Sequence, residues 1–206
     1  MLGNFYSAGQ VCSNGTRVFV QKGLKAKFLE RLAARSAAIL LGDPLDEATQ
    51  MGPLVSAAQL DKVLAYIETA KAEGATLVCG GGRAALNTGY YVQPTVFADV
   101  TDAMTIAREE VFGPVLAIMV YDDVEQAIQI ANDTAYGLSG YVWGTDVAAA
   151  KAVAARLRTG MVHLNGASLD SAAPFGGYKM SGIGREWGVH GLEEFLEIKS
   201  VYGGAA

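Results

Sequence analysis

The chain has 206 residues, of which 51% are apolar and 18% charged, and its formal net charge at pH 7 is −5. A chain of this length and apolar content can bury a core, so the composition excludes a disordered polyelectrolyte and predicts a globular protein. The excess of acidic over basic side chains argues against a protein that binds the phosphate backbone of nucleic acids.

The first third of the chain is predicted to form one strand and two helices. The N-terminus has neither a basic start nor a long apolar segment, so no signal peptide is predicted and a cytoplasmic protein is expected. Residues 16–20 are β-branched and aromatic and indicate a strand. Apolar side chains recur at helical spacing over residues 24–41 and again from Leu60 to Ile67, where Ser56 is the predicted helix cap.

The middle of the chain is predicted to form three strands. Residues 75–79 and 91–97 are typical of strands around a glycine-rich turn. Residues 115–121 form a continuous apolar run, typical of a strand buried on both faces. This run is the longest unbroken apolar stretch, yet it is far shorter than the ~20 residues of a membrane-spanning helix, so no membrane is expected as a partner.

The second half alternates between helices and strands. Helices are predicted over residues 124–131 and 147–157, and strands over residues 139–143 and 161–164. Such alternation implies right-handed crossovers between parallel strands. The candidate caps of these two helices are Asp122 or Asp123 and Thr145 or Asp146.

The end of the chain combines an irregular segment with one further strand. Residues 166–185 are rich in glycine and lack periodicity, and an irregular segment of this length is usually functional. Residues 194–202 alternate and suggest an edge strand. The sequence therefore predicts an α/β fold with a mostly parallel sheet flanked by helices and a C-terminal edge strand, in a single domain over residues 1–206.

Two cysteines occur, Cys12 and Cys79, which are too few for a disulfide scaffold. Cys12 lies in a small, polar turn, where backbone N–H groups can stabilise a thiolate that attacks a carbonyl carbon. From spacing alone, a buried structural cysteine is the more frequent alternative. Cys79 lies in an apolar run and is predicted to pack in the core, and no redox motif links the two thiols. The two histidines have no ligand-spaced partners, so no metal site is predicted.

Two loops have compositions that suit a ligand. In residues 109–114 two carboxylates and an aromatic residue precede the buried strand, and such a loop can accept ribose hydroxyls and pack on a ring. A solvated acidic turn with a core phenylalanine is the alternative. Residues 174–182 are typical of a loop that closes over a ligand, with Phe175 as its apolar contact, or of a purely structural turn.

Four motifs together resemble the catalytic domain of the NAD(P)-dependent aldehyde dehydrogenase superfamily, and the resemblance covers nearly the whole chain. Their order and approximate spacing are those of the family, which makes the resemblance specific. The motifs are Gly9-Gln10-Val11-Cys12, Glu110-Val111-Phe112-Gly113-Pro114, Tyr136-Gly137-Leu138, and Pro174-Phe175-Gly176-Gly177-Tyr178-Lys179 with Ser181-Gly182.

The resemblance implies a role for each candidate residue. Cys12 matches the nucleophile that attacks an aldehyde to give a thiohemiacetal and then a thioester that water hydrolyses, and its backbone N–H would donate to the oxyanion. Glu110 matches the carboxylate that binds the nicotinamide ribose of NAD or NADP, with Phe112 beside it. The other matches are Gln59 and Lys62, on the adenosine side of the cofactor, and Tyr6, Val11, Ser13 and Phe175, in the walls of the substrate tunnel.

The resemblance also implies parts that these 206 residues do not contain. Family members are more than twice as long, and their Rossmann-type cofactor domain, general-base glutamate and oxyanion-hole asparagine precede the nucleophile. In the family, the strand at residues 194–202 pairs with a hairpin that bridges subunits. We therefore expect impaired turnover by the chain alone, a possible partner chain that carries the N-terminal cofactor domain, and a homo-oligomer.

The expected substrate is a small aldehyde. Residues 166–173 match the variable specificity loop and lack the Trp-Gly-Glu-Ser type of sequence of betaine aldehyde enzymes, so betaine aldehyde is not the predicted substrate. The sequence does not distinguish NAD from NADP. The alternative function is that of a non-catalytic oligomerisation or interaction module that retains the fold.

Overall fold

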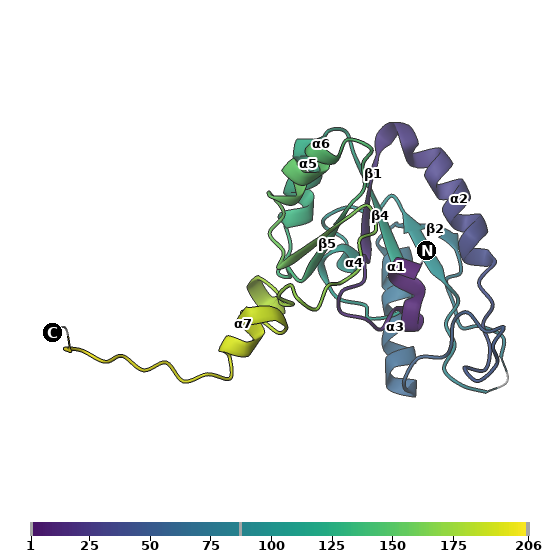
Figure 1. Cartoon of the computed structure of the whole chain (residues 1–206). Coiled ribbons are helices and arrows are strands. Elements are labelled where there is room, and N and C mark those ends of the chain that lie inside the picture. Colours follow the sequence, from purple (N-terminus) through teal and green to yellow (C-terminus); the bar gives the residue numbers. More distant parts are fainter. Residues whose placement is uncertain (1, 87, 205–206) are drawn as a thin grey trace. The chain divides into compact units, whose positions relative to one another are not determined.

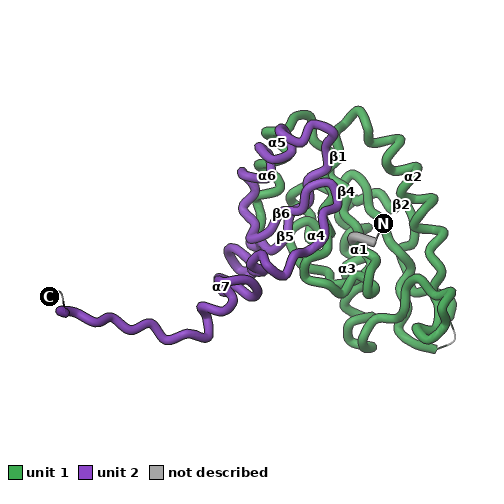
Figure 2. Tube along the Cα trace, in the orientation of Figure 1, with its two compact units in different colours: residues 1–134 green, residues 135–206 purple. Residues whose placement is uncertain are grey.

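The chain forms two compact units, residues 1–134 and residues 135–206 (Figure 2). The computed structural model describes residues 2–86 and 88–204. The prediction that residues 1–206 form a single catalytic domain is not tested by this division and stays a prediction.

The first unit is built on a four-stranded sheet with the strand order β1-β4-β3-β2 (Figure 1). β4 pairs in parallel with β1 on one side and with β3 on the other, whereas β2 joins β3 in antiparallel register. The predicted apolar run forms β4, one of the two inner strands of this mostly parallel sheet. The strands are β1 (Arg17–Gln21), β2 (Thr76–Cys79), β3 (Thr95–Ala98) and β4 (Val115–Tyr121).

Two helices of the first unit, α3 and α5, begin at caps that the sequence predicts. The Ser56 hydroxyl accepts a hydrogen bond from Gln59 N at 3.2 Å, and the Asp123 carboxylate accepts one from Gln126 N at 2.9 Å. Both bonds satisfy a backbone donor that the first helical turn leaves free. The helices are α1 (Leu2–Phe5), α2 (Lys25–Ala37), α3 (Ala57–Ala72), α4 (Thr105–Arg108) and α5 (Val124–Asn132).

One hydrophobic cluster holds the first unit together. Ile67 of α3, Phe97 of β3 and Ile118 of β4 are completely buried in it. Burial of an apolar side chain of this size contributes about 1.5–3 kcal/mol to stability. This core fixes α3 against the sheet and thereby fixes the loop that enters β4.

The second unit contains a parallel pair of strands, β5 (Ser139–Val142) and β6 (Met161–Leu164). Helix α6 (Val147–Ala154) connects them, and Asp146 caps it by accepting a hydrogen bond from Ala149 N at 3.0 Å. The predicted strand–helix–strand alternation is thus observed. A short helix, α7 (Gly188–Glu193), follows the irregular segment.

The predicted C-terminal edge strand does not form in this chain. Among the described residues, 194–204 contain no strand, and the segment extends beyond α7 (Figure 1). Strand residues obtain their backbone hydrogen bonds from a neighbouring strand, and no described segment pairs with this one. Its apolar side chains consequently lie in solvent, with Ile198 96% and Tyr202 92% exposed.

The short helices α1, α4 and α7 were not predicted, because they have at most six residues and carry little periodicity. The strand predicted over residues 91–97 begins only at Thr95. Short 3-10 turns occur at Tyr6–Gly9, Lys22–Leu24 and Lys179–Ser181. Within the described part of the chain, no helix combines the length and the apolar character that crossing a bilayer requires.

Candidate functional site

The turn that carries Cys12 is held from two sides. Asn14 N donates to Val11 O at 3.1 Å, and the Asn14 side-chain amide donates to Asn4 O at 3.2 Å. Cys12 is a free thiol with an exposed side chain, so the alternative of a buried structural cysteine is wrong for this residue. No described group accepts a hydrogen bond from Cys12 N, which leaves this N–H available to a ligand.

Cys79 is placed differently. Its side chain is half-buried and packs against the hydrophobic cluster, and its sulfur lies 3.8 Å from Pro94 O. Burial raises the pKa of the Cys79 thiol, and the nearby polar groups of Ser36 and Val96 oppose this shift. The contact with the hydrophobic cluster confirms the predicted packing role. A thiol whose pKa is raised is also a poor nucleophile.

The segment before Cys12 has an unusual backbone. Ser7, Ala8 and Gly9 all have positive φ, at 49°, 54° and 75°. A Cβ at Gly9 would lie 2.1 Å from Gly113 O, so only glycine allows the two backbones to approach this closely. This contact sets the Cys12 turn beside residues 109–113, which we term the carboxylate loop.

The two glutamates of the carboxylate loop are not equivalent. The Tyr66 hydroxyl donates to Glu109 Oε2 at 2.7 Å. The Glu110 side chain is exposed, and no described residue forms a hydrogen bond or ion pair with its carboxylate; Lys62 Nζ donates only to its backbone oxygen, at 3.2 Å. Glu110 therefore retains two acceptor oxygens for a diol, and this fits the ribose of the cofactor implied by the resemblance.

Phe112 and Gln59 lie together. Gln59 Nε2 donates to Phe112 O at 2.7 Å and to Val111 O at 3.4 Å. Phe112 has a φ of 56° and is partly exposed, while Val111 is buried. The structure thus brings the predicted cofactor residues to one loop, but the nitrogens of Gln59 and Lys62 bind carbonyl groups of that loop.

The predicted tunnel residues fall into two groups. Tyr6, Val11 and Ser13 belong to the first unit, as Cys12 does, and Tyr6 is 62% exposed. Phe175 belongs to the second unit, where its backbone exchanges two hydrogen bonds of 2.7 Å with Glu186. A tunnel that combines Phe175 with Tyr6 stays a prediction.

Strand β1 follows the Cys12 turn directly and is anchored by the partly buried guanidinium of Arg17. Arg17 donates to Ile130 O at 3.3 Å and to Ala131 O at 3.1 Å, at the end of α5. Burial lowers the pKa of Arg17, while the carboxylates of Asp102 and Asp133 raise it. The guanidinium thereby satisfies carbonyls at a helix C-terminus, where a cation is favoured.

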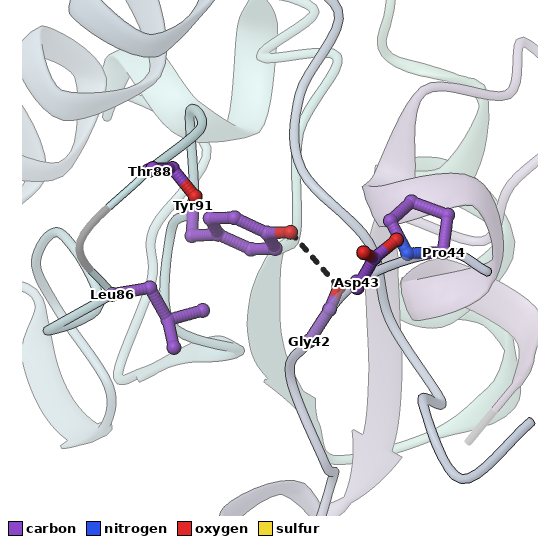
Figure 3. Close-up of a pocket in the computed structure, with 6 residues that line it drawn as sticks. All are labelled: Gly42, Asp43, Pro44, Leu86, Thr88 and Tyr91. Atoms are coloured by element: carbon purple, nitrogen blue, oxygen red, sulfur yellow. Dashed lines mark hydrogen bonds between the residues drawn. The ribbon is translucent and has the colours of Figure 1, made fainter. Parts of the chain in front are cut away.

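Two cavities lie away from these residues. One of about 290 Å³ in the first unit is bordered by the loop after α2 and by residues before β3, and Tyr91 Oη donates there to Gly42 O at 2.9 Å (Figure 3). Another of about 520 Å³ in the second unit is lined by Trp143, Gly144, Thr145 and Asn165. Neither has Cys12 or Glu110 in its lining.

Tyr66 was not predicted from the sequence. Tyr66 lies seven residues after Gln59 and four after Lys62, so helical spacing places the three side chains on one side of α3. This spacing is the signal in the sequence from which Tyr66 could have been predicted. The approach of Gly9 to Gly113 had no such signal, because it joins residues that are distant in the sequence.

Comparison with known proteins supports the resemblance to aldehyde dehydrogenases that the four motifs indicate. The model of the aldehyde dehydrogenase family matches residues 1–201. Betaine aldehyde dehydrogenases of Cereibacter sphaeroides (strain ATCC 17029 / ATH 2.4.9) and Rhizobium leguminosarum bv. trifolii are 60% and 59% identical to 99% of this chain, which covers 42% of each relative. The chain therefore spans less than half the length of these relatives.

Solved structures agree. Aldehyde dehydrogenase C of Pseudomonas syringae, in complex with NAD+ and octanal, has a TM-score of 0.93 and 48% identity, covering 95% of this chain and 41% of that protein. An NAD+ complex of a Bacillus cereus aldehyde dehydrogenase has a TM-score of 0.94 and 47% identity, covering 97% and 41%. These similarities confirm the resemblance based on the four motifs and the α/β fold.

Proposed function

Because this chain belongs to the aldehyde dehydrogenase family, we propose that it is the part of an NAD(P)-dependent aldehyde dehydrogenase that carries the nucleophilic cysteine. The reaction oxidises an aldehyde to a carboxylic acid. The observation that carries the proposal is the placement, in one compact unit, of the exposed Cys12 thiol beside a loop whose Glu110 carboxylate binds no described residue.

Cys12 supplies the nucleophile. Its sulfur, as the thiolate, forms a bond to the carbonyl carbon, and the π electron pair moves to oxygen to give a thiohemiacetal oxyanion. The N–H of Cys12, which no described group binds, donates to this oxygen where the negative charge develops. The C=O bond re-forms as the carbon loses a hydride, which leaves a thioester. Water then adds, the C–S bond breaks, and the acid leaves with the thiolate restored.

Glu110 and Phe112 are the residues that would hold the cofactor. A bound nicotinamide dinucleotide supplies the acceptor for the hydride. The unbound carboxylate oxygens of Glu110 would accept hydrogen bonds from two ribose hydroxyls, and the partly exposed Phe112 would pack beside the nicotinamide ring. Direct contacts of Gln59 and Lys62 with the adenosine side remain predictions, since their nitrogens bind loop carbonyls in this structure.

The 206-residue chain alone should turn over slowly. The resemblance assigns the general base and a second oxyanion donor to the part of the family's chain that precedes Cys12. Loss of each would reduce the rate by ~10²–10⁴-fold. Transfer of an acyl group to Cys12 needs neither a hydride acceptor nor a cofactor, so hydrolysis of an activated ester tests the nucleophile by itself.

The experiment compares p-nitrophenyl acetate hydrolysis by the unmodified chain, Cys12→Ala and Cys79→Ala. The thiolate of Cys12 displaces p-nitrophenolate, and water releases acetate from the resulting thioester. We expect Cys12→Ala to reduce hydrolysis to the level of buffer, whereas Cys79→Ala, the matched control, retains it. Equal rates for Cys12→Ala and the unmodified chain would overturn the proposal.

For the substrate, we propose a small aldehyde. Two relatives are named betaine aldehyde dehydrogenases and a solved relative is in complex with octanal, whereas residues 166–173 lack the Trp-Gly-Glu-Ser sequence. Competition against p-nitrophenyl acetate distinguishes these possibilities, because an aldehyde that occupies Cys12 slows ester hydrolysis. We expect stronger inhibition by propanal than by betaine aldehyde, and the reverse order would overturn the prediction from the loop.

Self-association is a second candidate role, favoured by the exposed apolar side chains of residues 194–202. An extended segment without strand partners tends to pair with another chain. Light scattering after size exclusion should give a dimer or larger assembly for the full chain and a smaller mass for a chain ending at Glu193. Equal monomer masses for the two chains would contradict this role.

A further inference from the structure

One side of α3 contacts successive residues of the carboxylate loop. The Tyr66 hydroxyl binds the Glu109 side chain at 2.7 Å, and Lys62 Nζ binds Glu110 O at 3.2 Å. One turn earlier, Gln59 Nε2 binds Phe112 O at 2.7 Å. The loop therefore runs antiparallel to the helix, and three side chains hold its residues in order.

An apolar contact completes this arrangement. Val63 of α3 lies so close to Gly113 that a Cβ at Gly113 would be 2.5 Å from Val63 Cγ2. Val63 is itself completely buried, which fixes this part of the helix to the core. The carboxylate loop is thus held by hydrogen bonds along its length and by close packing at its end.

We infer that Gln59, Lys62 and Tyr66, which we term the α3 clamp, are positioning residues that present the Glu110 carboxylate to its ligand. The inference rests on the proposed role of Glu110 in binding the cofactor. On this inference, Gln59 and Lys62 act on the cofactor indirectly, by holding the carboxylate loop in place, and Tyr66 is a further residue of the site. The clamp acts on three backbone carbonyls and on the Glu109 side chain, so it leaves the Glu110 carboxylate unbound.

Tyr66 separates the functions of the two neighbouring carboxylates. Its hydroxyl binds Glu109, and its ring lies 5.7 Å from the Lys62 ammonium, within the range of a cation–π contact. Tyr66 thus fixes both the residue before Glu110 and the cation that binds the Glu110 carbonyl. The Glu110 side chain remains available because Glu109 takes the only hydroxyl donor in the clamp.

Gln59 stabilises the strained end of the loop. Phe112 has a φ of 56°, a region that residues other than glycine rarely adopt. The amide of Gln59 binds the carbonyl of this same residue, and the backbone of Gln59 is in turn fixed by the Ser56 cap. A donor that is already held in place favours the unusual conformation at Phe112 over its alternatives.

Hydrogen exchange measures the clamp without any cofactor. The variants Gln59→Ala, Lys62→Met and Tyr66→Phe each remove one donor. Mass spectrometry follows, in the full chain, the peptides that cover the carboxylate loop and its two hydrogen-bonded boundary amides: Glu109 N, which donates to Thr105 O, and Val115 N, which donates to Gly113 O. Loss of one hydrogen bond should accelerate local opening, and hence exchange, by about 3- to 10-fold. Lys62→Arg keeps a donor and should restore slow exchange. Tyr90→Phe is the control, because the Tyr90 hydroxyl binds no described residue.

Titration with NAD+ then connects the clamp to Glu110. We expect the clamp variants to weaken NAD+ binding by about 3- to 10-fold together with faster exchange, since a mobile loop must be ordered by the ligand. Glu110→Gln should weaken NAD+ binding while exchange in the loop stays at the rate of the unmodified chain. A positioning residue should therefore change both the exchange rate and the NAD+ affinity, whereas a residue that touches the ligand should change the affinity alone.

The outcomes for the two proposals differ. Unchanged exchange in all three clamp variants, with the fold intact by circular dichroism, overturns the clamp whatever happens to NAD+. Faster exchange with unchanged NAD+ affinity overturns its positioning role. If the unmodified chain and Glu110→Gln bind NAD+ with equal affinity, the proposed role of Glu110 fails, and the α3 clamp then has no ligand to serve.

Discussion

The backbone of Gly9 lies directly against the carbonyl of Gly113, where a side chain would have no room. Gly9 is three residues before the Cys12 thiol, and Gly113 ends the loop that carries Glu110. Two segments separated by about a hundred positions in the sequence thus meet through backbone atoms. The contact ties the position of the proposed nucleophile to that of the proposed cofactor carboxylate.

Gly9→Ala should destabilise the protein and impair the nucleophile. The new Cβ would meet Gly113 O at 2.1 Å, and the residue would also have to keep a φ of 75°. We expect the free energy of unfolding to fall by at least about 2 kcal/mol, because the clashing atoms belong to a backbone that cannot turn aside. Chemical denaturation measures this loss, and p-nitrophenyl acetate hydrolysis should fall with it.

Gly74→Ala is the matched control for this prediction. Gly74 also has a positive φ, 93°, but a Cβ there would have nothing within 4 Å. It therefore carries the conformational cost of about 1 kcal/mol without the clash. Equal losses of stability in Gly9→Ala and Gly74→Ala would show that the close contact with Gly113 does not add to the cost of the substitution.

Alkylation should distinguish the two cysteines. Cys12 is exposed, whereas burial raises the pKa of the half-buried Cys79 thiol. Iodoacetamide reacts with thiolates, so mass spectrometry near neutral pH should find Cys12 modified well before Cys79. Raising the pH should accelerate modification of Cys79. Preferential labelling of Cys79 in the folded protein would contradict the structural assignment of both thiols.

The family and most regular elements could be predicted from the sequence, because each depends on local signals. The apolar run of β4 and the caps Ser56 and Asp123 are patterns within a few residues. The α3 clamp was not predicted, because it joins side chains of a helix to carbonyls about fifty positions away. The prediction of an edge strand at residues 194–202 was wrong. Alternating apolar and polar side chains indicate that a segment can form a strand, but they do not show that a neighbouring strand is present to pair with it.

The ion pair between Lys25 and Asp99 should make a small, pH-dependent contribution to stability. Its hydrogen bond lowers the pKa of Asp99, and burial opposes this shift. A carboxyl group with a lower pKa in the folded state stabilises the protein above its unfolded pKa and loses this effect as the pH falls through the folded value. Both side chains are partly exposed, so solvent screening limits the contribution to under about 1 kcal/mol.

The measurement is urea denaturation of Lys25→Met and of the unmodified chain as a function of pH. The stability difference should be present at neutral pH and disappear in acid, once Asp99 is protonated. Lys27→Met, whose lysine binds no described residue, is the control and should show no such profile. A difference that persists in acid would assign the effect of Lys25 to packing of its side chain.

Ser56→Ala should weaken both α3 and the carboxylate loop. The Ser56 hydroxyl accepts the hydrogen bond from Gln59 N, and the side chain of that same Gln59 holds Phe112 O. Loss of a cap of this kind costs about 1 kcal/mol of stability. Because Gln59 lies in the turn that the cap closes, exchange of the amides of residues 109–113 should also become faster. Asp123→Ala removes the equivalent cap of α5 and should reduce stability by a similar amount without this effect on the loop. If both variants accelerate loop exchange equally, the cap of α3 acts only through global stability.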